Sequence, residues 1–274
     1  MRGDSTVRVV LVYPDLLGTY GDSGNATVLA QRLRWRGYSA EVTTIEAGHG
    51  VPSSCDLYVV GGGEDLPQAL AARNLGAGVD GAPTALLEAA TQPSGRRPLH
   101  RAVGSGAAVF AVCAGLQILG SSFVGPDGVE AEGLGLLDCR SVRGQGRRAV
   151  GELVVDPDPT HGLPLLSGFE NHGAVTSLGS GSQPLGRVVT GVGNGDGLDG
   201  AVSGRVLGTY LHGPALARNP DLADLLLSWV VGELAPLDDS EALELRSERL
   251  RAAGAAGGGG DRRRRTAGRV RIRR

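Results

Sequence analysis

The sequence predicts an α/β protein with a largely parallel central sheet flanked by helices, and with mixed or antiparallel strands added in the C-terminal half. Short apolar runs rich in β-branched residues alternate with amphipathic segments up to about residue 130. From about Gly133 the segments become short and alternating, separated by Gly, Pro and Asn, which is typical of antiparallel or mixed strands. One buried run ends at a cysteine, directly before a helix.

The first half is predicted to contain four strands with helices between them. We expect the strands at 7–12, 40–45, 56–60 and 107–112. Asp22 or Ser23 is a candidate N-cap for a helix that ends at Gly37. Further helices are expected at 64–75, 82–90 and 114–119. This order predicts parallel pairing with both faces of the sheet covered.

The second half is predicted to add strands and one amphipathic helix. The strands are expected at 150–155, 174–175, 187–189, 198–202 and 206–211, and the helix at 219–232. Residues 1–235 are therefore expected to form one domain. Residues 236–274 pass from acidic, through Gly257–Gly260, to a stretch with eight arginines in 262–274, and they predict a flexible tail.

Composition limits the class of protein. The chain has 274 residues, 41% of them hydrophobic, and a net charge of -2, so nothing overall predicts binding to nucleic acid. All 27 basic residues are arginine, which we attribute to a GC-rich genome. The cysteines lack the spacing of a zinc site or a disulfide framework. No apolar run reaches the ~20 residues of a membrane span, and we expect a cytoplasmic protein with reduced thiols.

The strongest candidate for chemistry is Cys113. A buried strand ends at this residue, Ala114 and Gly115 follow, and a helix begins, which is the pattern of a nucleophile elbow. The helix N-terminus is expected to lower the pKa of the thiol and to offer N–H groups to an oxyanion. Cys113 could instead be a small buried apolar residue, as many free cysteines are. The small residues after it favour the nucleophile.

A histidine and a glycine run complete the candidate site. His212 follows a predicted strand that would deliver it to the same sheet edge as Cys113, and it is the best base candidate among the five histidines. Gly61–Gly63 follow another strand and allow a ligand to approach the backbone closely. This run lacks the spacing of a nucleotide-binding loop. The segment 103–108 resembles a dinucleotide-binding loop, but its glycines precede a strand where such a loop would follow one.

These motifs resemble the class I glutamine amidotransferase domain, and within it the cobyric acid synthase-like branch. Three segments are closer still to the amidotransferase subunit family of lipid II isoglutaminyl synthases. They are Tyr-Pro-Asp-Leu at 13–16 with Tyr-Gly-Asp-Ser-Gly-Asn at 20–25, Gly-Phe-Glu-Asn-His-Gly at 168–173, and Gly-Thr-Tyr-Leu-His-Gly at 208–213. The resemblance covers roughly residues 7–232 and implies a class I glutamine amidotransferase-like fold.

The resemblance implies a catalytic pair and its surroundings. Cys113 would attack L-glutamine and His212 would handle the protons, with no metal. Gly62, Gly63 and Ala114 would form the oxyanion hole. Arg148 would bind the substrate, with Arg147 as an adjacent alternative, and both could instead be exposed strand arginines. Many relatives place a glutamate two residues after the histidine, but Pro214 stands there. Asp22, Asn171 and His172 are candidates for orienting or lining the site, and a helix N-cap is the alternative for Asp22.

The resemblance also implies a partner. A Mur-ligase-like subunit would form a heterodimer with this chain and use ATP and Mg²⁺ to amidate the D-glutamate α-carboxylate of lipid II in peptidoglycan biosynthesis, giving D-isoglutamine. No cofactor is expected in this chain, which we expect to be too short for a synthetase domain of its own. A corrin-type (cobyric or cobyrinic acid) amidation and a stand-alone γ-glutamyl hydrolase remain alternatives. An inactive scaffold is disfavoured because both Cys113 and His212 are present.

Overall fold

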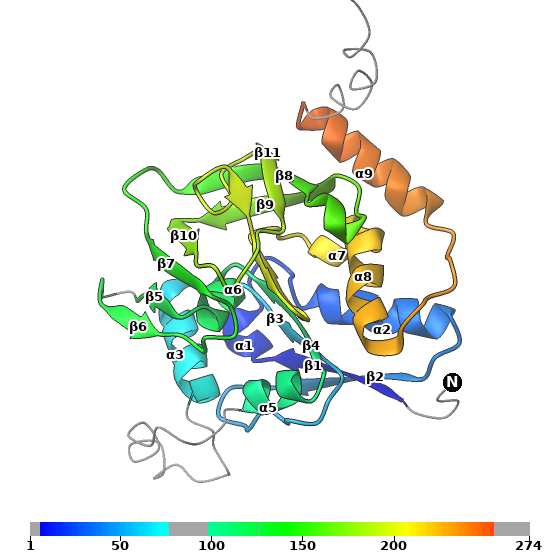
Figure 1. The fold of residues 1–274 in the computed structure, drawn as a ribbon, viewed down its shortest axis with the longest axis horizontal. Helices are drawn as coiled ribbons and strands as arrows, with labels where there is room; N and C mark the ends of the chain where they lie inside the picture. Colours follow the sequence, from blue (N-terminus) through cyan, green and yellow to red (C-terminus); the bar gives the residue numbers. More distant parts are fainter. Residues whose placement is uncertain (1–5, 77–97, 126, 255–274) are drawn as a thin grey trace, which may run out of the picture.

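The computed structural model describes residues 6–76, 98–125 and 127–254 (Figure 1). The helix expected at 82–90 and the arginine-rich stretch at 262–274 lie outside these residues.

A six-stranded sheet forms the centre of the molecule, in the order β13-β14-β4-β3-β1-β2. Its strands are β1 (Val7–Val12), β2 (Ala40–Ile45), β3 (Leu57–Val60), β4 (Ala108–Val112), β13 (Ala201–Ser203) and β14 (Val206–Thr209). All neighbours are parallel except the edge pair β13 and β14. The four strands expected in the first half are confirmed. The largely apolar sequences of β1, β3 and β4 match burial on both faces, whereas the edge strand β2 has no fully buried residue.

Helices cover both faces of this sheet (Figure 1). On one side α2 (Gly24–Trp35), α7 (Ala215–Arg218) and α8 (Pro220–Val231) pack together. On the other, α3 (Asp65–Gly76) contacts both α1 (Pro14–Leu17) and α6 (Ala114–Leu119). A further helix, α5 (Pro98–Gly104), precedes β4. The α/β fold class predicted from the sequence is confirmed.

Most of the later strands form two additional four-stranded sheets. One has the order β10-β7-β5-β6 and the other β12-β11-β8-β9. Their strands are β5 (Ser122–Val124), β6 (Glu130–Glu132), β7 (Cys139–Arg143), β8 (Ala149–Pro157), β9 (Leu166–His172), β10 (Ala174–Leu178), β11 (Gly186–Thr190) and β12 (Leu198–Asp199). Only β13 and β14 join the central sheet, so its expected extension by the other strands is wrong. Strands such as β11 bury side chains on one face and expose them on the other. This pattern fits a separate sheet that is packed on one side only.

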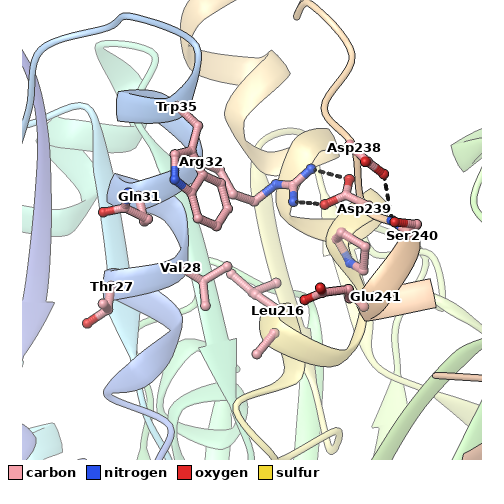
Figure 2. A pocket seen from close by; sticks show the side chains of 13 residues that line it. Thr27, Val28, Gln31, Arg32, Trp35, Leu216, Asp238, Asp239, Ser240 and Glu241 are labelled. Carbon is pink, nitrogen blue, oxygen red and sulfur yellow. Dashed lines mark hydrogen bonds and ion pairs between the residues drawn. The ribbon is translucent and has the colours of Figure 1, made fainter. Parts of the chain in front are cut away.

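The segment expected to be a flexible tail from residue 236 contains a helix, α9 (Ser240–Ala252). Arg32 on α2 is 3% exposed and bonds both carboxylate oxygens of Asp224 and of Asp239, at 2.6–2.8 Å. Figure 2 shows this guanidinium reaching Asp239 at one end of a cavity of about 500 Å³ between α2 and the start of α9. Arg246 on α9 also pairs with Asp221 on α8. The composition of this segment did not reveal its ion pairs with α2 and α8. The prediction of a flexible tail therefore needs correction over residues 239–252.

None of the helices in the described part of the chain is long and apolar enough to cross a membrane.

Candidate active site

Cys113 lies in a strained turn between β4 and α6. Its backbone has φ 52° and ψ -104°, a conformation that costs a non-glycine residue about 1–3 kcal/mol and that persists where the surroundings enforce it. The Cys113 N–H donates to Thr209 O at 2.9 Å, and Gln117 N–H donates to Cys113 O at 3.1 Å. The sharp strand-to-helix turn expected at this residue is therefore present.

Close packing explains the small residues after Cys113. A side chain at Gly115 would place its Cβ 2.6 Å from Val60 O and 3.1 Å from Gly61 O. Helix α6 thus starts directly against the end of β3, and a larger residue at 115 would push the two apart.

Burial, rather than the helix N-terminus, controls the pKa of the thiol. Cys113 is 5% exposed, and burial together with the charge of Asp22 raises its pKa to about 12. The Ala114 N–H bonds the sulfur and Arg148 adds a positive charge, but these two effects are smaller. The expected lowering of this pKa is therefore wrong. Its six-residue helix is too short to offset the lost hydration of a thiolate.

His212 is buried and bonded to Asp22. The His212 Nδ1 atom lies 2.8 Å from Asp22 Oδ2, and both side chains are fully buried. Residues 112 and 209 are partners in the parallel pair of β4 and β14, so Cys113 and His212 follow strands that end at the same sheet edge. His212 Nε2 is buried and has no hydrogen-bond partner among the described residues. The imidazole therefore has one nitrogen fixed and the other available.

The alternative explanation of Asp22 as a helix cap is wrong. Ser23, and not Asp22, is the N-cap of α2, and its side chain makes no capping hydrogen bond. The Asp22 carboxylate instead accepts from His212 and from the Gly62 N–H, at 3.0 Å. Asp22 thus holds the His212 ring at its Nδ1 atom.

The Gly62 contact changes the expected oxyanion hole. Its N–H is already bonded to Asp22, and its carbonyl accepts from Thr19 N–H at 3.2 Å. Gly62 is therefore not a free donor for an oxyanion. Gly63 lines a cavity of about 70 Å³ together with Cys113, and Ala114 already donates to the sulfur. Gly63 and Ala114 remain the candidate donors.

The same cavity contains three other predicted site residues: Arg148, Asn171 and His172. The Arg148 Nε atom donates to Asn171 Oδ1 at 2.5 Å, and its Nη2 donates to Asn171 O at 3.0 Å. These three residues form one wall of the cavity because Arg148 directly precedes β8, and residues 149 and 150 of β8 pair with residues 172 and 171 of β9. Arg147 is not among the cavity-lining residues, so the structure favours Arg148 of the two adjacent arginines.

His172 has a separate buried network. Its ring stacks on Tyr210 with centroids 3.9 Å apart, and its nitrogens lie 3.0 Å from Ala174 O and 3.3 Å from Glu170 Oε2. Glu170 also accepts from the N–H groups of Val192 and Gly193. His172 thus ties the cavity wall to the loop after β11. It has no bond to His212 or Asp22.

Two aromatic residues in the quoted motifs were given no role from the sequence. The Tyr20 ring meets the His212 ring edge-on with centroids 4.9 Å apart, and Phe169 stacks on His212 at 5.3 Å. Their only signal was their place in the segments 20–25 and 168–173, because ring contacts between distant segments leave no local pattern. No group of three or more metal-binding side chains occurs among residues 6–76, 98–125 and 127–254.

The central sheet and the strand–cysteine–helix turn at its edge define a class I glutamine amidotransferase-like fold. Residues 8–220 match the CobB/CobQ-like glutamine amidotransferase domain, and the chain belongs to that family. A solved structure described as a glutamine amidotransferase is 22% identical, covers 81% of this chain and 98% of its own, and superposes with a TM-score of 0.50, which supports the fold.

The chain is also similar to three curated proteins. The GatD subunit of lipid II isoglutaminyl synthase (glutamine-hydrolyzing) from Staphylococcus aureus is 36% identical, over 78% of this chain and 79% of that protein. Its Streptococcus pneumoniae counterpart is 29% identical, over 81% and 79%. A cobyric acid synthase from Xanthobacter autotrophicus is 41% identical, but over 39% of this chain and 22% of that protein.

Replacing Gly62 by alanine tests the packing of the site. The added Cβ would lie 2.6 Å from His212 Cε1 and 2.9 Å from Asp22 Oδ2, so the pair must shift. We expect glutaminase turnover to fall about 100-fold, as a displacement of roughly 1 Å can cause. The measurement is ammonia release, with the melting temperature as a fold check. Gly151→Ala is the matched control because its Cβ would meet nothing within 4 Å. Equal activity in the two variants would contradict the assignment of the His212–Asp22 pair to the active site.

Proposed function

We propose that this chain is a glutaminase in which Cys113 is the nucleophile, His212 the acid and base, and Asp22 the residue that orients His212. The observation that carries the proposal is the buried 2.8 Å contact between His212 and Asp22, on the sheet edge where Cys113 occupies its strained turn. A histidine held at Nδ1 with Nε2 unbonded can exchange protons with a thiol at the same sheet edge.

The reaction begins with a proton transfer. Because the pKa of Cys113 is raised to about 12, its thiol is protonated at neutral pH, and His212 Nε2 takes the proton as the sulfur attacks the glutamine carboxamide. The tetrahedral intermediate collapses as the imidazolium protonates the leaving nitrogen, which gives ammonia and a γ-glutamyl thioester. Water, deprotonated by His212, then cleaves the thioester to glutamate and the thiol. Asp22 stabilises the imidazolium in both steps.

Two further groups support these steps. The N–H groups of Gly63 and Ala114 are proposed to bind the oxyanion, and each such donor contributes about 3 kcal/mol to transition-state stabilisation. Arg148 is proposed to bind the glutamine α-carboxylate. Its position in the cavity wall with Cys113 supports this role.

We propose lipid II as the final acceptor of the ammonia. The two GatD proteins are named as glutamine-hydrolysing subunits of lipid II isoglutaminyl synthase, and the alignment with this chain covers 79% of each. By this proposal a cytoplasmic Mur-ligase-like subunit binds the chain as a heterodimer. With ATP and Mg²⁺ it activates the D-glutamate α-carboxylate, and ammonia converts this group to D-isoglutamine in peptidoglycan synthesis.

A stable complex is favoured on chemical grounds. Ammonia in neutral water is mostly ammonium, which has no lone pair for attack on a carboxyl group. Release into solvent would therefore waste the nitrogen. A closed route between two active sites keeps it unprotonated.

A corrin-type amidation is the second candidate. It is supported by the similarity to the Xanthobacter cobyric acid synthase, but this similarity covers a smaller part of both chains than the GatD alignments do. A Mur-ligase-like protein encoded by the adjacent gene would favour lipid II, and a corrin enzyme there would favour this alternative.

The proposal is tested by reconstitution with the neighbouring ligase-like protein. Purified subunits, lipid II, L-glutamine and ATP are expected to yield amidated lipid II, detected by mass spectrometry. The product is expected only when both subunits are present. Full amidation by either subunit alone with glutamine would refute the two-subunit scheme. Glutamine hydrolysis without lipid II amidation in the complete mixture would refute the acceptor but retain the glutaminase.

A further inference from the structure

A continuous series of contacts links Arg148, the proposed substrate-binding arginine, to His212. Arg148 donates to Asn171 through Nε and Nη2. The Asn171 Nδ2 then donates to the Tyr20 hydroxyl at 2.6 Å. The Tyr20 ring edge meets the His212 ring, with centroids 4.9 Å apart and planes at 71°. These four residues come from four separate segments, and Asn171 joins Arg148 to Tyr20.

The Asn171 amide has a fixed orientation. Its Oδ1 accepts from Arg148 and its Nδ2 donates to Tyr20, and flipping the amide would place the Nδ2 donor against a guanidinium, which can only donate. The amide therefore transmits the position of Arg148 to the Tyr20 hydroxyl.

Tyr20 is itself held in a conformation that tyrosine rarely adopts. Its φ is 63°. This backbone conformation costs a bulky residue about 1–3 kcal/mol, and residues that adopt it are concentrated at functional sites. The adjacent Thr19 N–H donates to Gly62 O at the end of β3, which fixes the loop. Gly62 also donates to Asp22, so one glycine supports both the Tyr20 loop and the carboxylate behind His212.

The His212 ring is restrained by aromatic groups as well as by Asp22. Phe169 stacks on it at 5.3 Å and 24°, and Tyr20 meets Phe169 edge-on at 5.6 Å. His212 and Phe169 also exchange backbone hydrogen bonds, at 2.8 and 3.3 Å. Asp22 fixes one atom of the ring, and the two aromatic side chains limit rotation about that contact.

We propose that Tyr20 and Asn171 are positioning residues that hold the glutamine-anchoring Arg148 and the His212 ring in one fixed relation. This inference rests on the proposed glutaminase function. No described acceptor is bonded to the Arg148 Nη1, which can take a carboxylate oxygen while Nε and Nη2 hold Asn171. A glutamine anchored there has its carboxamide at a set distance from Nε2 of His212. Positioning of this kind lowers the barrier more than it tightens ground-state binding.

The test is a double-mutant cycle on glutaminase kinetics with the full chain and its ligase subunit. Tyr20→Phe removes only the hydroxyl, and kcat is expected to fall about tenfold, the kinetic equivalent of one hydrogen bond. KM is expected to change less than about twofold because Arg148 still binds the carboxylate. Asn171→Leu is expected to lower kcat similarly. The double variant is expected to be no slower than Asn171→Leu alone, since both changes break one link.

Labelling of Cys113 by the glutamine analogue diazo-oxo-norleucine provides a second readout. At saturating reagent its rate is expected to fall in the same ratio as kcat. Tyr38→Phe is the matched control. Tyr38 lies in the connection between α2 and β2, and the variant that lacks its hydroxyl is expected to react like the unaltered protein.

Three outcomes would overturn the positioning role. They are an unchanged kcat in Tyr20→Phe, an effect confined to KM, and single-variant effects that multiply in the double variant. Each is distinguishable from failure of the proposed function, because in that case the unaltered protein would not be labelled at Cys113.

Discussion

Cys113→Ser is expected to abolish glutamine-dependent amidation and to leave amidation from high ammonium largely intact. A serine hydroxyl is a much weaker nucleophile at this site, and a loss of about a thousandfold or more in glutaminase turnover is expected. Ammonium supplies nitrogen without the glutaminase reaction, so the proposed ligase subunit keeps its substrate. Both rates are measured on the reconstituted complex. Equal loss with both nitrogen sources would mean that Cys113 does not generate the ammonia.

The raised pKa of Cys113 gives this experiment a pH arm. A pKa raised to about 12 keeps the thiol protonated through the neutral range, so iodoacetamide, which has no glutamine-like groups, is expected to leave Cys113 unmodified at pH 7. Its reaction rate is expected to keep rising up to at least pH 10, where an ordinary thiol with a pKa near 8.5 would be levelling off. Diazo-oxo-norleucine is expected to label Cys113 at pH 7, because it occupies the substrate site.

The other two cysteines are internal controls. Cys55 and Cys139 lie outside the cavity that contains Cys113, and Cys139 is 2% exposed. Cys55→Ser and Cys139→Ser are expected to retain turnover. Labelling by the glutamine analogue at either residue would overturn the assignment of the nucleophile.

Local patterns in the sequence predicted the parts of the site that depend on neighbouring residues. The strand ending at Cys113 and the small residue at 115 are visible because an elbow is built from consecutive positions. The strands β1, β3 and β4 could be placed because buried parallel strands are nearly continuous apolar runs. His212 could be placed at the same edge because a strand precedes it.

Contacts between distant segments could not be predicted in this way. Asp22 lies 190 residues from His212, and its short polar side chain looked equally suited to a helix cap. The Gly62 N–H was expected to face an oxyanion, but it is bonded to Asp22. The pKa of Cys113 depends on total burial, which no local pattern reports. Arg32 likewise gave no sign that it would bind Asp239 and order the segment after residue 236.

Asp22→Asn is expected to lower glutaminase turnover by about 10³–10⁴-fold, the loss typical of removing the charge behind a catalytic histidine. Asparagine has nearly the same shape and can still accept from the Gly62 N–H, so the fold is expected to persist. Its neutral amide no longer stabilises the imidazolium. KM for glutamine is expected to change little, because Arg148 lies on a different segment of the cavity wall. Asp158→Asn is the control. Asp158 lies in an exposed turn, where its side chain accepts from the Thr160 N–H, and the change is expected to leave glutaminase turnover unaltered.

His212→Ala completes the comparison and is expected to cost several orders of magnitude in turnover, since thiol deprotonation and protonation of the leaving ammonia are both lost. The double variant Asp22→Asn with His212→Ala is expected to be no slower than His212→Ala alone, because Asp22 acts through the imidazole. His172→Ala is expected to cost less, since His172 bonds Ala174 and Glu170 and not the His212–Asp22 pair. A larger loss in His172→Ala would make His172 the base. Multiplying losses in the double variant would mean that Asp22 acts on glutamine or Cys113 directly, and not by orienting His212.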